Sequence, residues 1–383
     1  MKLLLQGFFW FLFALHLRLL LMLFLHFYSV QTGFEGFFGS GGDDRYYHDA
    51  AMRLAKGEEM PSLPNIYPLV LAWLYSLFGP HLIVGKLVNV LLGSLSVYYG
   101  VRIANLLESG KYSSFSLTRP SNLAGLFLAV YPSSLFYSAL LVRDSFILFL
   151  GTVSLYWGLK LLKKPHLREF VLLPLSLAAL FSFRGYAAVA FLFAFSVYYL
   201  SGVVFFNIQR ALVGVFLAIV LPMFLGWGPA GFGYLLPLLD IERLSPFREG
   251  YSAAASGVGI SLDFSNPLSF LFSYAYSFIT ALLGPLPWQV KNTAIAIPLI
   301  EAMPFWFLFL IAFKKKSRIS REASFLLLFA FIYLGGVALF SDNIGSNTRL
   351  RLLPWSALLI YFALRLGRSS DVLFLSHHLH HPR

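Results

Sequence analysis

The chain contains no cysteine among its 383 residues, which excludes disulfide bonds, thiolate catalysis and zinc–thiolate sites. Charged residues are also scarce, at 12% where soluble domains carry about 25%. A Gly-rich phosphate-binding loop is missing as well, so we expect no nucleotide cofactor. Hydrophobic residues make up 58% of the chain, which is the composition of an integral membrane protein.

Long apolar runs recur along the chain, and a membrane-spanning helix needs about 20 such residues. The runs are continuous rather than alternating, which favours helices over strands. We therefore predict an all-α, polytopic integral membrane protein with about ten transmembrane helices. It would form a single domain over 1–383 without a separate soluble domain, and outer loops at 30–80 and 227–293 would add juxtamembrane helices. The predicted spans are 7–29, 82–107, 122–141, 145–162, 170–183, 186–205, 211–226, 294–313, 324–340 and 352–367.

Basic residues gather in loops on one side of the predicted spans. Short cytoplasmic loops are enriched in Lys and Arg, which places both termini in the cytoplasm and the acidic loops outside the cytoplasmic membrane. The formal net charge of +12 comes from bases scattered at span ends, so it does not indicate nucleic acid as a partner. The basic clusters are Lys163 with Lys164 and Arg168, Lys314–Lys316 with Arg318 and Arg321, and Arg365 with Arg368.

One further apolar run, 268–284, is almost long enough to cross the membrane. If it crossed, the cluster Lys314–Lys316 would lie outside and Arg349 and Arg351 inside, against the rule for basic loops. We therefore expect this run to form a re-entrant or interfacial helix on the outer side. Trp288 would follow it at the depth of the lipid headgroups.

The first outer loop carries two adjacent carboxylates, Asp43 and Asp44, after a pair of glycines. One carboxylate can act as a base while its neighbour orients it or holds a cation. The following stretch, 46–55, has the pattern of an amphipathic helix that lies on the membrane, which would fix the pair at headgroup depth. Tyr46 and Tyr47 would then contact the substrate. A loop whose acids are simply solvated is the alternative.

A third acid, Asp144, follows Arg143 in a short turn between two predicted spans. Asp144 could serve only as the cap of the helix that follows. A tight hairpin could instead bring it close to the first loop, so that the carboxylates share one site.

Single basic residues stand at the outer ends of several predicted spans. Arg184 is the most informative, because it lies in a near-apolar turn. An arginine there either snorkels to the headgroups or has an anionic partner, and a phosphate suits a planar guanidinium. The candidates for binding a lipid phosphate are Lys86, Arg143, Arg184, Arg349 and Arg351, and Arg248 in the long outer loop is a weaker candidate for substrate binding.

Several motifs follow one another in a characteristic order. They are Asp43-Asp44-Arg45-Tyr46-Tyr47, the Pro-Leu-rich stretch 66–79 that ends in Phe-Gly, Lys86-Leu87-Val88-Asn89 with Gly93, the stretch from Tyr131-Pro132 to Asp144, Ser182-Phe183-Arg184-Gly185, and Arg349-Leu350-Arg351 before Pro354. In this order they resemble the protein O-mannosyltransferase and aminoarabinose-transferase families, which belong to the C-type superfamily of polytopic membrane glycosyltransferases.

The resemblance implies transfer of a sugar, with inversion, from a polyprenyl-phosphate-linked donor to a glycan, lipid or protein acceptor on the outer face. Asp43 takes the position of the family's catalytic base, and Asp44 that of its acidic neighbour. Asp144 would orient the acceptor or hold a divalent cation. The sequence Arg143-Asp144-Ser145 and the element 284–288 depart from the family pattern, which leaves the acceptor open.

Two other classes of function remain open. A polysaccharide polymerase or ligase would use outward arginines, such as Arg184, Arg248 and Arg349, to hold a lipid pyrophosphate. A lipid flippase or transporter would use the same cations without bond chemistry, although such proteins usually show related halves. Membrane lipids are expected partners in all three classes.

Overall fold

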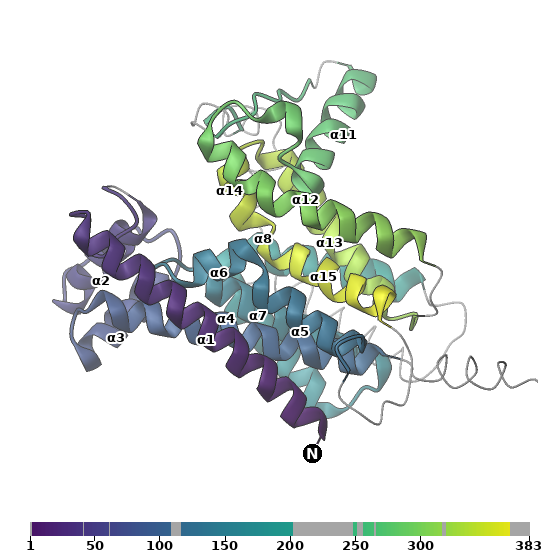
Figure 1. Ribbon diagram of the computed structural model, residues 1–383, viewed down its shortest axis with the longest axis horizontal. Helices are drawn as coiled ribbons and strands as arrows, with labels where there is room; N and C mark the ends of the chain where they lie inside the picture. Colours follow the sequence, from purple (N-terminus) through teal and green to yellow (C-terminus); the bar gives the residue numbers. More distant parts are fainter. Residues whose placement is uncertain are drawn as a thin grey trace, which may run out of the picture.

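The computed structural model describes residues 2–40, 42–60, 62–108, 116–201, 248–250, 256–263, 266–315 and 319–367. Within these residues every regular element is a helix, apart from one isolated bridge between Gly257 and Asn343. Six of the described helices are long and apolar enough to cross a membrane. The predicted all-α, multi-pass membrane fold is therefore confirmed (Figure 1).

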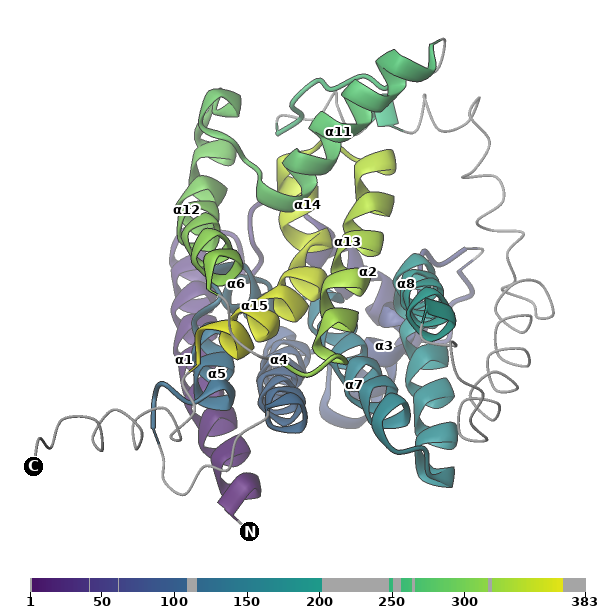
Figure 2. The same cartoon turned by 90° about the vertical axis from the view of Figure 1, so that its right-hand side faces the viewer.

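The six long helices are α1 (Lys2–Gln31), α4 (Leu82–Leu107), α7 (Asp144–Lys163), α8 (Leu167–Ser201), α12 (Thr293–Lys314) and α13 (Ala323–Phe340). Two shorter helices, α5 (Pro120–Val130) and α15 (Leu352–Leu366), complete the bundle, in which α4 packs against α1, α5, α7 and α15 (Figure 2). Small residues allow close approach. A Cβ atom at Gly151 of α7 would lie 2.4 Å from the Leu353 side chain of α15.

Most predicted spans match helices of this bundle. The spans 7–29, 82–107, 145–162, 294–313, 324–340 and 352–367 correspond to α1, α4, α7, α12, α13 and α15. The predicted span 211–226 lies outside the described residues, as does the end of the span 186–205.

The prediction of one continuous helix over 122–141 is wrong. The chain forms α5 and then the short helix α6 (Pro132–Ser138), because Pro132 has no N–H to donate and its ring clashes with the preceding turn. Arg18, buried in the middle of α1, stabilises this break. Its Nη2 lies 3.4 Å from the carbonyl oxygen of Leu128 and donates to Ser134 Oγ at 2.9 Å.

Helix α8 is two helices joined at a sharp bend. Arg184 alone has non-helical dihedral angles there, with φ −156° and ψ 87°. Both arms then contact the same stretch of α7: Ser154 bonds Ser176 of the first arm at 3.0 Å, and a Cβ at Gly158 would lie 2.7 Å from Phe191 of the second. Both arms therefore extend from Arg184 toward the same end of α7, as the separate spans 170–183 and 186–205 predict.

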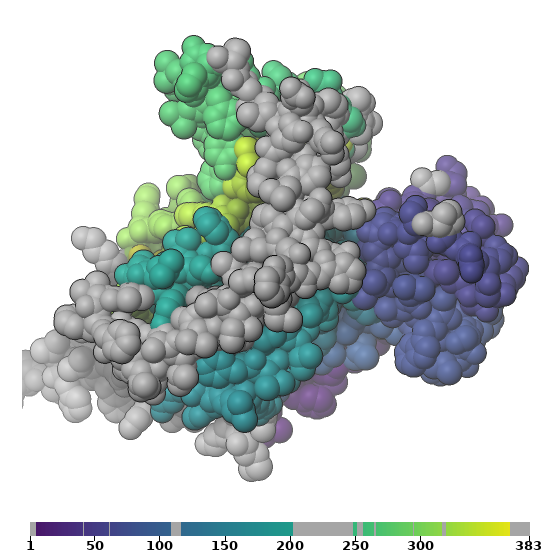
Figure 3. Space-filling view, turned by 180° about the vertical axis from the view of Figure 1, so that it is seen from behind, coloured from purple at the N-terminus to yellow at the C-terminus, as the bar shows by residue number. Residues whose placement is uncertain are grey.

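The remaining helices lie at one end of the bundle, which we name the site end; the opposite end, with Lys163, Lys164 and Lys314, is the basic end. Helices α2 (Asp43–Ala55) and α3 (Tyr67–Phe78) form a lobe that projects from the bundle (Figure 3). Helix α11 (Pro267–Leu283), the short turn Pro287–Gln289 and α14 (Ile344–Leu350) also lie there (Figures 1 and 2). The run 268–284 is therefore a helix at the site end, and its interfacial or re-entrant placement stays a prediction.

Candidate active site

Four charged side chains from distant parts of the chain meet at the site end, and we name them the charged cluster: Asp43, Asp144, Arg184 and Arg349. Oδ1 of Asp144 accepts a hydrogen bond from Arg184 Nη2 at 3.1 Å. Its Oδ2 accepts two from Arg349, from Nε at 2.9 Å and Nη2 at 2.7 Å. The third nitrogen, Nη1 of Arg349, donates to Asp43 Oδ2 at 2.5 Å. Arg349 therefore joins the two carboxylates.

Each member of the charged cluster stands at the end or bend of a helix. Asp43 and Asp144 are the first residues of α2 and α7, where a helix favours negative charge. Arg184 forms the bend of α8, and Arg349 lies in the last turn of α14. Exposure of the side chains rises from 0% at Asp144 and 5% at Arg184 to 23% at Arg349 and 53% at Asp43. Asp43 is therefore the accessible carboxylate of the group.

A hydrogen-bonded scaffold fixes the turn before Asp144. Asn89 of α4 donates through Nδ2 to the carbonyl oxygens of Leu140 at 2.7 Å and Val142 at 2.8 Å. The same amide lies 3.1 Å from the Tyr67 hydroxyl, so α3 is tied to this turn as well. The motif Lys86–Gly93, recognised only by resemblance, thus contributes Asn89 as the residue that positions Asp144.

Arg143 lies beside the charged cluster and binds the bend of α8. Its Nη1 donates to the carbonyl oxygen of Phe183 at 3.1 Å. The ring of Phe183 stacks on that of Phe146, with centroids 4.8 Å apart. These contacts hold the Arg184 bend against the first turn of α7.

Two tyrosines that the sequence does not distinguish flank the arginines of the cluster. The guanidinium carbon of Arg349 lies 5.7 Å from the ring of Tyr137, whose hydroxyl bonds Thr348 Oγ1 at 2.8 Å. Arg184 lies 5.7 Å from the ring of Tyr186. Burial tends to lower the pKa of Arg349, but Asp144 and Asp43 outweigh this and raise its pKa above the ordinary value. Arg349 is therefore a permanent cation.

Hydrogen-bonding capacity that the described residues do not use remains on Arg184 of the cluster and on two residues close in sequence to its members. Nε of Arg143, Nε of Arg184 and Nδ2 of Asn347 are buried donors without a partner in the described part of the chain. Buried donors in proteins nearly always have a partner. These donors are available to a ligand in addition to the bonds within the cluster.

Asp44 and Lys86 are not part of the charged cluster, and their predicted roles in catalysis and phosphate binding stay predictions. The buried Asp44 carboxylate accepts hydrogen bonds from the backbone N–H groups of Phe38 at 2.5 Å and of Arg45 at 3.0 Å. Lys86, also buried, donates through Nζ to the carbonyl oxygen of Gly36 at 2.5 Å. Both side chains hold the loop that precedes α2, because its backbone groups need partners when they are buried.

Arg351 belongs to a second buried ion pair outside the charged cluster, and its predicted role in phosphate binding stays a prediction. Its Nη2 lies 3.0 Å from Glu301 Oε1, Nη1 donates to the Gly284 carbonyl, and its guanidinium stacks 3.9 Å above the Trp355 ring. Glu301 also accepts from the backbone N–H of Ser133 at 2.7 Å. The sequence offered a signal for Glu301, since an acid inside an apolar span is rare and needs a partner.

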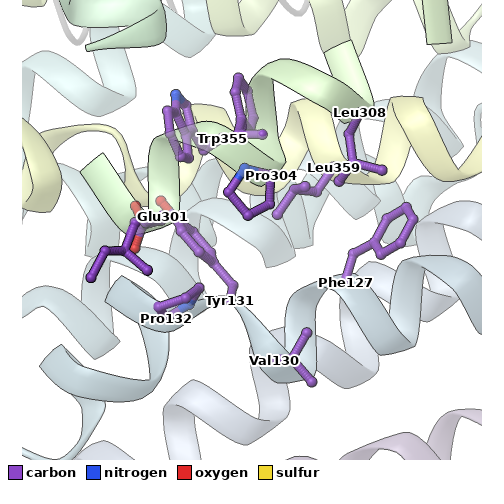
Figure 4. A pocket seen from close by; sticks show the side chains of 11 residues that line it. Phe127, Val130, Tyr131, Pro132, Glu301, Pro304, Leu308, Trp355 and Leu359 are labelled. Carbon is purple, nitrogen blue, oxygen red and sulfur yellow. The ribbon is translucent and has the colours of Figure 1, made fainter. Parts of the chain in front are cut away.

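A largely apolar cavity of about 220 Å³ opens beside this second pair. It lies between the end of α5 and helices α12 and α15, with Phe127 and Val130 on one wall and Pro304, Leu308 and Leu359 on the other (Figure 4). Glu301 and Tyr131 stand at its polar end (Figure 4).

The remaining predicted contacts separate into exposed and buried groups. Tyr46 is 43% exposed and lies beside Asp43 in the first turn of α2, so it remains a candidate for substrate contact. Tyr47 is buried, and its ring packs edge-on against that of Tyr67. Arg248 is buried too, and donates to the carbonyl oxygens of Ile260 at 2.8 Å and Ala338 at 2.7 Å. It stabilises the end of α13 rather than joining the charged cluster.

A divalent cation was one alternative for Asp144. Within the described ranges, no group of three or more His, Asp or Glu side chains could hold a metal ion. Asp144 instead uses both of its oxygens for Arg184 and Arg349. Its geometry is that of a residue that positions two cations.

No model of a known protein family matches the chain, and no curated protein sequence matches it. The crystal structure of ArnT from Cupriavidus metallidurans bound to undecaprenyl phosphate is similar in fold, with a TM-score of 0.55 and 16% sequence identity. The match covers 95% of this chain but 62% of that chain, so the chain spans less than two thirds of that protein. The similarity shows that the two chains share a fold.

Proposed function

We propose that the protein is a membrane glycosyltransferase that moves a sugar from a polyprenyl-phosphate-linked donor to an acceptor hydroxyl, with the site end facing outward. One observation carries the proposal. Arg349 joins the half-exposed Asp43 to the buried Asp144, which also binds Arg184. An accessible carboxylate is therefore part of one network with two fixed guanidinium groups. The fold similarity to a protein bound to undecaprenyl phosphate supports a lipid phosphate as the ligand of those cations.

The proposed reaction is a single in-line displacement. An oxygen lone pair of the acceptor hydroxyl attacks the anomeric carbon while the bond from that carbon to the phosphate oxygen breaks. Asp43 accepts the hydroxyl proton, and polyprenyl phosphate leaves with the bonding electrons, so the anomeric centre inverts. Arg184 and Arg349 stabilise the charge that develops on the departing phosphate, because fixed cations in a water-poor site act strongly on developing charge. Asp144 is the positioning residue that holds both cations.

The ion pair between Asp43 and Arg349 suggests the order in which the two substrates bind. Oδ2 of Asp43 accepts a hydrogen bond from Arg349 Nη1, so this oxygen is occupied while the pair is intact. A donor phosphate competes with Asp43 for Arg349 Nη1, whereas Asp144 keeps the other two nitrogens. Binding of the donor would therefore release Asp43 to accept the proton, so the donor would bind before the acceptor.

The apolar cavity between α5, α12 and α15 offers a place for part of the prenyl chain. Its apolar walls suit a hydrocarbon, since burial of apolar surface stabilises binding by roughly 25 cal/mol per Å². Tyr137 on the short helix α6 contacts Arg349, and Ser133 on the same helix contacts Glu301 at the cavity's polar end. Helix α6 therefore links the cavity to the charged cluster.

The test uses purified full-length protein and undecaprenyl phosphate linked to a labelled sugar, with cell membranes as the source of acceptor. The proposal predicts release of undecaprenyl phosphate and transfer of the label, and both should fail in the Asp43→Asn variant. Lys56→Gln is a matched control, because Lys56 ends the same helix and is exposed. Donor binding with no transfer by the wild-type protein under any acceptor condition would contradict an enzymatic role and favour a flippase or transporter.

A further inference from the structure

A second cavity, lined by charged side chains, lies at the basic end of the bundle, far from the charged cluster. Its volume is about 500 Å³, and it opens where α7 ends, where α8 begins and where α13 begins. The polar residues that line it are Lys160, Lys163, Lys164, His166, Glu169 and Glu322. Both signs of charge therefore face one space.

The position of this cavity is that of a lipid headgroup. Helix α7 has 20 residues and so extends about 30 Å, which is the thickness of the hydrocarbon core, and Asp144 stands at its other end. Two basic side chains near this depth contact the ring of one tryptophan, Trp157. The Nζ of Lys160 lies 5.2 Å from the ring of Trp157, and the Arg168 guanidinium carbon lies 4.8 Å from the same ring.

The buried carboxylate of Glu169 points to a ligand with a hydrogen-bond donor. The residue is 2% exposed, and its Oε1 lies 3.5 Å from Lys160 Nζ. Its Oε2 is buried without a partner in the residues that the structure covers. A buried acceptor that lacks a donor is costly, and more so when it is charged. A ligand that donates an N–H bond to this oxygen would remove that cost.

The lysines point to a phosphate on the same ligand. Lys163 uses one of its three donors on the Leu106 carbonyl oxygen, at 2.5 Å, and keeps two. Lys164 and His166 are exposed beside it. Lysine is a common phosphate binder. A ligand with only negative charge would be repelled by Glu169 and Glu322, and one with only positive charge would be repelled by the three lysines. A ligand that carries both charges suits the lining better.

We propose that this cavity binds one phospholipid whose headgroup carries both a phosphate and a primary ammonium, as in phosphatidylethanolamine. The ammonium donates to Glu169 Oε2, and Glu322 lines the same cavity. The phosphate binds Lys163 and Lys164, with His166 at the rim. Such a lipid joins the loop between α7 and α8 to the start of α13. The proposal is independent of the chemistry at the site end.

The test is native mass spectrometry of the delipidated full-length protein, titrated with phosphatidylethanolamine, phosphatidylcholine and phosphatidylglycerol that carry the same acyl chains. Phosphatidylcholine has no N–H to donate, and phosphatidylglycerol has no cation. We expect the first bound phosphatidylethanolamine to be held at least about 10-fold more tightly than either, the effect of one charge-assisted hydrogen bond.

Two variants separate the ammonium from the phosphate. Glu169→Gln should lower phosphatidylethanolamine binding to the level of phosphatidylglycerol. Lys163→Gln should weaken both lipids by a similar factor, and it keeps the proposal testable if Glu169→Gln does not fold. Lys314→Gln is the matched control at the same end of the bundle and should change nothing, because Lys314 does not line the cavity. Equal binding of the three lipids, displacement by millimolar inorganic phosphate, or an unchanged preference in Glu169→Gln would each overturn the proposal.

Discussion

Arg349 and Asp144 lie 205 positions apart in the chain, yet two nitrogens of Arg349 contact one oxygen of Asp144 at 2.7 and 2.9 Å. Helix α14, which carries Arg349, is only seven residues long and is anchored by Asn343, whose side chain accepts from the backbone N–H of Ser346. The pair therefore joins the late part of the chain to α7. The account of the site depends on this link, because it aligns one guanidinium with both Asp144 and Asp43.

The first prediction concerns stability. Asp144→Asn removes the negative charge that holds two arginines, one of them buried, and leaving a buried charge unpaired typically costs about 3–5 kcal/mol. Thermal unfolding of the purified variant should show a clear loss relative to wild type. Asp49→Asn, in an exposed position of α2, is the control and should change stability by less than about 0.5 kcal/mol. Equal losses in both variants would contradict the structural role given to Asp144.

The second prediction concerns the donor phosphate. Arg184→Ala should weaken binding of undecaprenyl phosphate by roughly 10- to 150-fold, because a charge-assisted hydrogen bond contributes about 1.5–3 kcal/mol. Arg184→Lys should recover only part of this, since lysine lacks the two-pronged geometry of a guanidinium. Arg248→Lys is a useful comparison, because Arg248 binds the end of α13 instead. Unchanged affinity in Arg184→Ala would make this arginine a structural anchor only.

The third prediction separates the two adjacent aspartates. Asp44 binds backbone N–H groups with both oxygens, and Asp44→Asn keeps only one acceptor. We expect a loss of about 1–3 kcal/mol in stability and a far smaller loss of turnover than in Asp43→Asn. Turnover should be compared at temperatures where both variants are equally folded. A rate for Asp44→Asn as low as that of Asp43→Asn would show that the neighbour takes part in the chemistry.

The fourth prediction concerns orientation, and the absence of cysteine makes it simple to measure. Single cysteines at Glu59 and Lys291, both exposed at the site end, should react with a membrane-impermeant maleimide on intact cells. A cysteine at Lys314, at the basic end, should react only after permeabilisation. Labelling of Lys314→Cys in intact cells would invert the proposed topology and place α11 on the cytoplasmic side.

The sequence predicted the helices well where apolar runs were long and uninterrupted, as in α4 over 82–107. It failed at 122–141, where one proline outweighed a continuous apolar pattern. The sequence could not predict the role of Arg18 at this break, because its partners on α5 and α6 come together only when the break forms.

The charged cluster was predictable in membership but not in geometry. All four residues were candidates. Asp43 was one because it adjoins a second carboxylate in the first outer loop. Asp144, Arg184 and Arg349 were candidates because a charge next to an apolar span usually has a partner. Their grouping depends on long-range packing that no local pattern encodes. In the folded chain Lys86, Arg248 and Arg351 bind other partners. Their charge alone could not distinguish them from the arginines of the cluster.

The most direct test of the central claim is the rate of sugar transfer by Asp43→Asn, measured with labelled undecaprenyl-phosphate sugar on protein of verified fold. The substitution keeps the size of the side chain and removes the base. We predict that undecaprenyl phosphate still binds within a few-fold of wild type, while transfer falls by about 10²- to 10⁴-fold. Transfer at a near wild-type rate, together with an inactive Arg184→Ala variant, would contradict the account and favour a polymerase or ligase that relies on its arginines.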